Sequence, residues 1–369
     1  MDYCDLAPPH ICAIAPYQPG KPISELAREM DLEESDIVKL ASNENPLGAS
    51  PRALAAIENV IMEIARYPDG NAFKLKTVLA QKHGVEMNRI VLGNGSNDVL
   101  ELAARAFLTP GTSAVYSRHA FAVYPLATQA TGARGIEAPA KDYGHDPEAL
   151  LAAIEADTRM LFVANPNNPT GTLLAPGVLL GLIERVPESV LVVLDEAYTE
   201  YLPDELKSDV DAWLQRFPNL IVTRTFSKAY GLAGLRVGYA LASPQVADMM
   251  SRVRQPFNVG SLAQAAAIAA MEDDAFLDEC LEINRQGMEQ LIAGFQRLGL
   301  DYIPSYGNFV ALRVGDAAAV NLSLLRQGVI VRPVANYGLP EYLRISVGLK
   351  GENEVFLQAL ERALRELGK

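Results

Sequence analysis

The run Val190-Leu-Val-Val-Leu194, followed directly by Asp195-Glu-Ala-Tyr198, decides how this chain of 369 residues folds. Every position of the run is apolar, which is typical of a strand buried on both faces of a parallel sheet. A second such pair stands downstream, where Leu220–Thr223 (LIVT) precedes Arg224-Thr-Phe-Ser-Lys-Ala-Tyr-Gly231. Ligands bind beyond the carboxyl ends of strands in open parallel sheets. This stretch therefore predicts an α/β fold with a site at one edge of its sheet.

The same alternation of short apolar runs and helical stretches extends from about residue 89 to residue 245. Such a βα rhythm predicts a mostly parallel sheet flanked by helices. The other predicted strands are Arg89–Leu92, Ser113–Tyr116, Met160–Ala164 and Val237–Ala240. The predicted helices between the strands cover residues 99–107, 121–130, 147–156 and 176–186.

A different pattern follows, with helical stretches, three strand-like runs and a closing helix; their ranges are 244–253, 261–300, 308–314, 328–334, 342–348 and 352–367. One core rarely grows beyond roughly 250–300 residues, so two core-bearing units are expected. We predict a large domain over 46–260 and a smaller α/β domain over 261–369. Residues 1–45 are rich in proline and lack helical period, so we predict an arm that joins the smaller domain.

Composition excludes several classes of protein. Hydrophobic residues make up 49% of the chain, which argues against disorder, and a net charge of −13 disfavours nucleic acid and anionic membranes as partners. Three cysteines without C-x-x-C spacing and four scattered histidines indicate a reducing compartment and no metal site. The acidic N-terminus is unlike a signal peptide, and no apolar run approaches the ~18 residues of a membrane span. We expect a cytoplasmic protein.

Two loops at strand ends suit a ligand. Gly93-Asn-Gly-Ser-Asn-Asp98 opens a helix, where glycines and helix N–H groups favour an anion, although Asn-Gly is also typical of hairpins. Asn165-Pro-Asn-Asn-Pro-Thr-Gly171 contains two X-Pro bonds that could fix a turn, with a cis bond or without one, and aim an Asn side chain into the site. An ordinary loop is the alternative for the second motif.

Two charged residues complete the set. Asp195 at the end of a buried strand is costly unless a cation pairs with it, or unless it caps a helix. Lys228 lies among small and neutral residues, where desolvation would lower its pKa and make it a nucleophile; a solvated surface lysine is the alternative. Together with the two loops and Arg236, these residues match what pyridoxal phosphate requires: a lysine, an acid for the ring nitrogen and an anion site.

On these motifs the chain resembles fold-type I pyridoxal-phosphate aminotransferases of the histidinol-phosphate aminotransferase subfamily. The likeness covers essentially the whole chain. The other matching segments are APYQPG (15–20), NENPLG (43–48), RYPD (66–69), TFSKAYGLAGLRVGY (225–239) and YLRISVG (342–348). One departure stands at Gly95-Ser-Asn-Asp98, where relatives often have Gly-Ser-Asp-Glu, so the resemblance supports a phosphate role for Ser96 more firmly than for Asn97.

The resemblance implies a role for each matching residue. Lys228 would form the Schiff base and carry a proton, Asp195 would keep the ring nitrogen protonated, and Tyr198 would bond the ring oxygen. Further cofactor contacts are implied for Gly95, Ser96, Asn97, Phe121, Asn168, Thr225, Ser227 and Arg236. For Phe121, a core aromatic is the alternative.

The resemblance implies that four residues bind the substrate and that one residue contacts the cofactor of a partner subunit. Arg344 would bind the acidic end of the substrate, Arg332 its phosphate, and Tyr17 and Asn45 would line the pocket; a solvated strand-end arginine is the alternative for Arg332. Tyr67 would reach the cofactor phosphate of a neighbouring subunit, which implies a homodimer with composite sites.

The implied reaction is transamination between L-histidinol phosphate and 2-oxoglutarate, giving imidazole acetol phosphate and L-glutamate. An aromatic amino acid aminotransferase and a threonine-phosphate decarboxylase share these motifs and remain alternatives. A ligand-sensing domain of a transcription regulator would need an added DNA-binding head, for which the length and the charge of −13 leave no room.

Overall fold

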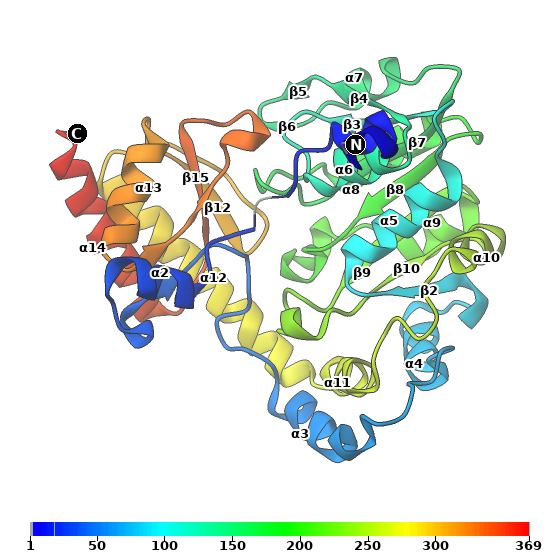
Figure 1. The fold of residues 1–369 in the computed structure, drawn as a ribbon, viewed down its shortest axis with the longest axis horizontal. Helices are drawn as coiled ribbons and strands as arrows, with labels where there is room; N and C mark the ends of the chain where they lie inside the picture. The colour runs from blue at the N-terminus through cyan, green and yellow to red at the C-terminus, as the bar shows by residue number, and fades with distance from the viewer. Residues whose placement is uncertain (1–2, 18, 369) are drawn as a thin grey trace.

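The computed structural model describes residues 3–17 and 19–368, which form a large and a small domain (Figure 1). Gln18 of the quoted APYQPG segment lies outside the described residues. A seven-stranded sheet forms the centre of the large domain, in the order β2-β10-β9-β8-β7-β3-β4, and only β10 runs antiparallel to its neighbours. The strands are β2 (Ile90–Gly93), β3 (Ser113–Ser117), β4 (Arg134–Ala138), β7 (Thr158–Ala164), β8 (Leu191–Asp195), β9 (Leu220–Thr225) and β10 (Gly238–Leu241). The predicted mostly parallel α/β sheet is confirmed.

One strand of this sheet was not predicted. β4 reads Arg-Gly-Ile-Glu-Ala and lies at the edge of the sheet, where only β3 pairs with it. Of its residues only Ala138 is buried. An edge strand with so little apolar surface lacks the run of buried residues on which the prediction of strands depends.

Helices cover both faces of the sheet, and each face has its own core. α5 (Ser96–Phe107), α6 (Val123–Ala130) and α10 (Pro244–Arg252) pack on one face, which we call the α5 face. The opposite face, which we call the α4 face, is covered by α3 (Pro51–Val60), α4 (Phe73–His83), α7 (Pro147–Ala152), α8 (Pro176–Arg185), α9 (Val210–Arg216) and α11 (Ser261–Met271). Along β8, Val193 belongs to the α5 core, whereas Val192 and Leu194 belong to the α4 core. The side chains of the residues directly after β8 continue to alternate between the α5 face and the α4 face.

The small domain is a four-stranded antiparallel sheet with three helices. Its strands are β11 (Tyr302–Ile303), β12 (Phe309–Arg313), β14 (Arg332–Pro333) and β15 (Tyr342–Ser346), in the order β11-β12-β15-β14. Its core is closed by α12 (Asp274–Arg297), α13 (Ala317–Arg326) and α14 (Lys350–Glu366). The predicted strand 328–334 is split, because β13 (Val329–Ile330) pairs with the arm and β14 pairs with β15.

The arm contacts both domains. β1 (Val38–Lys39) pairs in parallel with β13, and α2 (Ile23–Met30) packs Leu26 into a small core with Ile330. α1 (Pro9–Cys12) instead lies against the large domain, where Gln129 Nε2 donates to His10 O at 3.4 Å. In Figure 1 the arm accordingly runs from the large domain to the small one.

The division between the domains falls after α11. The stretch 261–300 was predicted as one helical region, but it forms α11 and α12, separated at residues 272–273. Ala263, Ala266, Ala267 and Ala270 of α11 belong to the core of the large domain, which therefore extends past residue 260. Within residues 3–17 and 19–368, no helix combines the length and the apolar character that a membrane span needs.

Candidate active site

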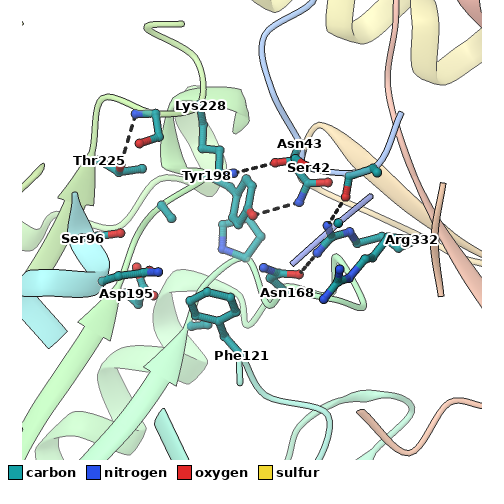
Figure 2. A pocket seen from close by; sticks show the side chains of 18 of the residues that line it. Ser42, Asn43, Ser96, Phe121, Asn168, Asp195, Tyr198, Thr225, Lys228 and Arg332 are labelled. Carbon is teal, nitrogen blue, oxygen red and sulfur yellow. Dashed lines mark hydrogen bonds between the residues drawn. The ribbon is translucent and has the colours of Figure 1, made fainter. Parts of the chain in front are cut away.

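A pocket lies between the domains, where the carboxyl ends of β7, β8 and β9 meet the small domain and the arm. Its empty space is about 870 Å³, the open mouth included. It brings together these predicted residues: Tyr17, Ser96, Asn97, Phe121, Asn168, Asp195, Tyr198, Thr225, Ser227, Lys228, Arg236, Arg332 and Arg344. In Figure 2, Ser96 and Thr225 lie on one side of Lys228 and Tyr198, and Arg332 lies on the other. The pocket thus has a hydroxyl-rich end and an arginine end.

Lys228 reaches this pocket from the turn that follows β9. Its Nζ donates a hydrogen bond to Ser42 O at 2.9 Å and lies 5.8 Å from the centroid of the Tyr198 ring. Burial, and then the positive charge of Arg344, lower the pKa of Lys228 to about 7. Near neutral pH a large share of the lysine is therefore an uncharged amine, which is the nucleophilic form.

Asp195 is 5% exposed and lies at the opposite wall from the arginine end. Its two carboxylate oxygens accept hydrogen bonds from Tyr124 OH at 2.8 Å and from Thr223 Oγ1 at 3.0 Å. Among the described residues no lysine, arginine or histidine forms an ion pair with it, and burial raises its pKa. A buried carboxylate held only by neutral donors is costly, so the site suits a cationic N–H group on a ligand.

The hydroxyl-rich end is a cradle for an anion. Gly95 has φ +84°, and a Cβ at this position would lie 2.7 Å from Arg236 Nη2; a Cβ at Gly238 would lie 2.5 Å from Ser96 N. Only glycine allows the backbone and Arg236 to approach this closely. α5 begins at Ser96 without a side-chain cap, so the helix presents its first N–H groups to an anion. Thr225 and Ser227 line the same end.

The proline-rich turn joins the two domains at the pocket. Both the Asn165–Pro166 and the Asn168–Pro169 bonds are cis. Asn168 Oδ1 accepts a hydrogen bond from Arg344 Nη1 at 2.6 Å, and Arg344 Nη2 donates to Ala41 O at 2.7 Å. Arg344 Nε is buried without a hydrogen-bond partner among the described residues. Because Arg344 lines the pocket and its guanidinium has five N–H groups, the N–H groups of Nη1 and Nη2 that these two bonds leave over are the donors for an acceptor that a ligand would bring.

Tyr198 is fixed by the end of the arm. Its hydroxyl accepts a hydrogen bond from Asn43 Nδ2 at 3.0 Å, and burial raises its pKa to about 12. Asn43 is itself 1% exposed with φ +55°, and its Oδ1 accepts from Ser346 Oγ at 3.0 Å. The tyrosine hydroxyl is thus neutral, positioned and able to donate to a ligand oxygen.

Four residues of the site were not predicted. Asn43 belongs to the quoted NENPLG segment, Tyr124 stands three residues after Phe121 on the same stretch, and Thr223 precedes Thr225 by two positions on the same strand face. Their spacing relative to predicted residues was a usable signal, because residues two apart on a strand and three apart on a helix share a face. The carbonyl of Ser42 carried no such signal.

Three predicted residues lie outside the pocket lining. Asn45 is buried behind the lysine turn, where its Nδ2 donates to Ala229 O and to Cys280 Sγ, both at 2.9 Å. Gly95 packs beneath Arg236, as described above. Tyr67 is 83% exposed and stacks on Phe257 with ring centroids 4.8 Å apart, away from the pocket of its own chain.

The substrate-side residues also have partners within the chain. The guanidinium of Arg332 lies 5.6 Å from the ring centroid of Tyr17, and both residues line the pocket together with Gly20. Phe121 meets Tyr124 edge-on, with centroids 5.9 Å apart. In the part of the chain that the structure describes, no group of three or more His, Cys, Asp or Glu residues could hold a metal ion.

Comparison with known proteins adds three findings. The family model for aminotransferase class I and II matches residues 35–360. Histidinol-phosphate aminotransferase of Methylobacillus flagellatus is 62% identical over 98% of this chain and 98% of its own length, and histidinol-phosphate aminotransferase 2 of Nitrosospira multiformis is 60% identical over 99% and 93%. The crystal structure of histidinol-phosphate aminotransferase from Sinorhizobium meliloti in complex with pyridoxal-5'-phosphate superposes with a TM-score of 0.90, at 30% identity and 97% coverage of both chains.

Proposed function

Because this chain belongs to the histidinol-phosphate aminotransferases, within the class I and II aminotransferase family, we propose that the pocket between its domains is the active site. Its activity is the reversible transamination between L-histidinol phosphate and 2-oxoglutarate in histidine biosynthesis, giving imidazole acetol phosphate and L-glutamate. The cofactor that we assign to the pocket is pyridoxal 5'-phosphate, which the Sinorhizobium meliloti structure contains.

One observation carries this assignment: the buried carboxylate of Asp195 has no cationic partner within the described residues, while the amine of Lys228 lines the same pocket. A protonated pyridine nitrogen would supply the missing charge at Asp195. The phosphate would lie at the cradle of Ser96, Asn97, Thr225, Ser227 and Arg236, and the ring oxygen near Tyr198 and Asn168. When bound, pyridoxal phosphate supplies an electron-withdrawing ring that acidifies the Cα–H bond of the amino substrate.

The residues of the chain supply the proton transfers. With a pKa of about 7, Lys228 Nζ is suited to accept the Cα proton and to return it to the neighbouring carbon of the cofactor. Asp195 stays ionised opposite the ring nitrogen once a cation pairs with it. Phe121 lines the pocket beside the space for the ring and excludes water from it.

The arginine end would hold the anionic group of the substrate. Arg344 is buried, lines the pocket and has the planar fork that suits a carboxylate. Arg332, which lines the same pocket, would bind the phosphate of histidinol phosphate, which lies at the far end of that substrate from the amino group. High identity to histidinol-phosphate aminotransferases over nearly the whole chain favours this activity over that of an aromatic aminotransferase or a threonine-phosphate decarboxylase.

We also propose that the protein forms a homodimer and that it is located in the cytoplasm. Met62, Ile64, Tyr67, Phe73 and Phe257 are exposed apolar side chains with accessible fractions between 45% and 89%. Tyr67 and Phe257 stack on each other, and contiguous exposed apolar side chains are typical of an interface. Tyr67 would then reach the cofactor phosphate in the partner's pocket and complete it.

A set of half-reactions tests the proposed function. The pyridoxal phosphate form is mixed separately with L-histidinol phosphate, L-glutamate, L-phenylalanine and L-tyrosine, and the absorbance of the lysine-bound cofactor is followed. We expect rapid loss with histidinol phosphate and glutamate and slow loss with the two aromatic amino acids. Faster conversion by phenylalanine than by histidinol phosphate would establish the aromatic alternative. In a separate incubation with L-threonine phosphate, release of carbon dioxide would establish the decarboxylase.

A further inference from the structure

A second buried carboxylate follows β8, and the proposed function does not use it. The side chain of Glu196 is 3% exposed and pairs with Arg224, whose side chain is 14% exposed. Nε and Nη2 of Arg224 both donate to Glu196 Oε2, at 3.0 and 2.7 Å. Neither residue lines the pocket. The pair lies on the α4 face, because Leu194 and Val222, two positions before its members, belong to the α4 core.

The ion pair joins the same two strand ends that carry the pocket residues. β8 and β9 run parallel with Asp195 in register with Thr223. On the α5 face Thr223 Oγ1 donates to Asp195 Oδ1, and on the α4 face Arg224 donates to Glu196. The backbone adds a third link, because Glu196 N donates to Thr223 O at 2.9 Å. The spacing of Asp195 from Thr225 is thus fixed from both faces of the sheet.

Stability alone gives no reason for charges at this position. Most of the surrounding core is apolar, although Tyr239 and Glu200 also face Arg224. Replacing a buried ion pair by hydrophobic residues of similar volume is often neutral or stabilising. What an Arg–carboxylate pair supplies and an apolar pair does not is a directed, charge-assisted geometry.

A purely structural role is the rival explanation. Arg224 is in register with Tyr239 on β10, whose hydroxyl lies 2.9 Å from His83 Nε2; His83 Nδ1 in turn lies 3.0 Å from Asp211 Oδ1. This chain of polar contacts links α4 and α9 to the sheet and reaches the surface at Asp211, whose side chain is 42% exposed. The ion pair could serve only to hold these helices, so a test must separate the two roles.

We propose that Arg224 and Glu196 are positioning residues, whose ion pair sets the separation between the ends of β8 and β9 and thereby places Asp195 and Thr225 for the cofactor. This inference rests on the cofactor site proposed above. It assigns a function to two residues that touch neither cofactor nor substrate.

The test uses the double variant Glu196→Met/Arg224→Met, which removes both charges of the pair and leaves Lys82 as the cation that faces Glu200. Cofactor-free protein is titrated with pyridoxal phosphate, and three quantities are measured: the Tm without cofactor, the Kd of the cofactor, and the visible circular dichroism of the bound cofactor. We expect an unchanged or raised Tm, a Kd about tenfold higher, since small misplacements at a site can cost up to ~100-fold, and an altered dichroic signal. A folded double variant with the Kd and dichroism of the wild type would overturn the proposal.

Two further variants keep the test decisive. Arg252→Met is the control. Arg252 Nε and Nη2 donate to Asp248 Oδ2 at 3.0 and 2.8 Å, which is the same geometry on the exposed side of α10. This variant should have the Tm, the Kd and the circular dichroism of the wild type. If the double variant does not fold, Arg224→Lys is used in its place, because this variant keeps the positive charge and loses the planar guanidinium that makes two hydrogen bonds to Glu196. Its Kd should rise at least about threefold, and a wild-type Kd would overturn the proposal.

The proposed function is checked in the same titration with Asp195→Asn. A normal Kd for Asp195→Asn beside a weakened double variant would contradict the assigned cofactor site. A weakened Asp195→Asn beside a normal double variant would contradict only the positioning role.

Discussion

Asp195 and Glu196 are neighbours in the chain, both are buried, and they have opposite surroundings. On the α4 face Glu196 is matched by Arg224. On the α5 face Asp195 is held only by neutral donors, which are the hydroxyls of Tyr124 and Thr223 and the backbone of Ala197. Lys228 and Arg344 at the same pocket likewise form no ion pair among the described residues. At the end of β8, the carboxylate on one face of the sheet therefore has an ion-pair partner, and the carboxylate on the other face has none.

This difference teaches how to locate a cofactor site in a chain without a ligand. Buried charges are costly unless paired, so a fold that retains several unpaired ones around one pocket keeps them for charges that arrive with a ligand. The three unpaired groups match the three demands of the reaction: an amine for the carbonyl, an anion for the ring nitrogen and a cation for the substrate acid. Glu196 and Arg224 show that the same strands can bury charge without such a need.

The largest effect is expected for Lys228→Ala. General acid–base transfer by a positioned group contributes about 10²–10⁴-fold, and loss of covalent attachment adds to it, so turnover should fall almost to zero while the cofactor can still bind non-covalently. Lys82→Ala is the matched control: its pKa is also lowered by burial, but its Nζ bonds Tyr230 OH on the α4 face, so turnover should stay within a few-fold of wild type. Equal losses in both variants would contradict a special role for the pocket lysine.

A large effect on kcat is also expected for Asp195→Asn. The effect of this variant on stability should be opposite to that of a substitution of Glu196 on the other face of the sheet. The variant should lower kcat at least ~100-fold, whereas a change within about threefold, or 0.65 kcal/mol, would contradict the role of the carboxylate at the ring nitrogen. Without cofactor, denaturant unfolding should show Asp195→Asn to be no less stable than wild type at pH 7, because it removes an unpaired buried charge. Glu196→Gln removes the carboxylate that Arg224 bonds, although Glu200 still faces the guanidinium, and the variant should lose about 3 kcal/mol.

The pH dependence of stability should reveal the unpaired lysine. Its pKa is about 7 in the folded protein and near 10.5 when unfolded, so the folded state holds the charged amine at a cost that is full below pH 7 and vanishes as pH rises past 10.5. Lys228→Met, measured without cofactor, should therefore exceed wild type in stability at pH 6 and lose this advantage steadily toward pH 10. A constant difference across this range would contradict the burial of an uncompensated charge.

The smallest effect is expected for Tyr67→Phe, which tests whether one chain suffices for the site. Losing a hydrogen bond to a charged phosphate should weaken cofactor binding by about 1.5–3 kcal/mol. In a heterodimer of Tyr67→Phe and Lys228→Ala chains, the site with native Lys228 receives native Tyr67 from its partner and should bind as wild type. Binding as in the Tyr67→Phe homodimer would show that Tyr67 acts within its own chain.

Much of the fold could be predicted, because a short apolar run such as 190–194 is typical of a strand that is buried on both faces of the sheet. The edge strand β4 escaped, since it buries little, and the break between α11 and α12 escaped because both helices continue one apolar period. Site residues at strand ends could be predicted from sequence position. Sequence spacing points to the positions of Asn43 and Tyr124 but not to their partners, because the arm crossing to Tyr198 and α6 facing Asp195 are long-range contacts.

The central claim is that the cofactor supplies the positive charge that Asp195 lacks. The most direct measurement is the ¹⁵N chemical shift of the ring nitrogen in ¹⁵N-labelled pyridoxal phosphate bound to the wild-type protein and to Asp195→Asn. We predict the shift of a protonated pyridinium in the wild type between pH 6 and 9, and the shift of a neutral pyridine in the variant at the upper end of this range. A neutral nitrogen in the wild type, or a pyridinium that persists unchanged in Asp195→Asn, would contradict the claim.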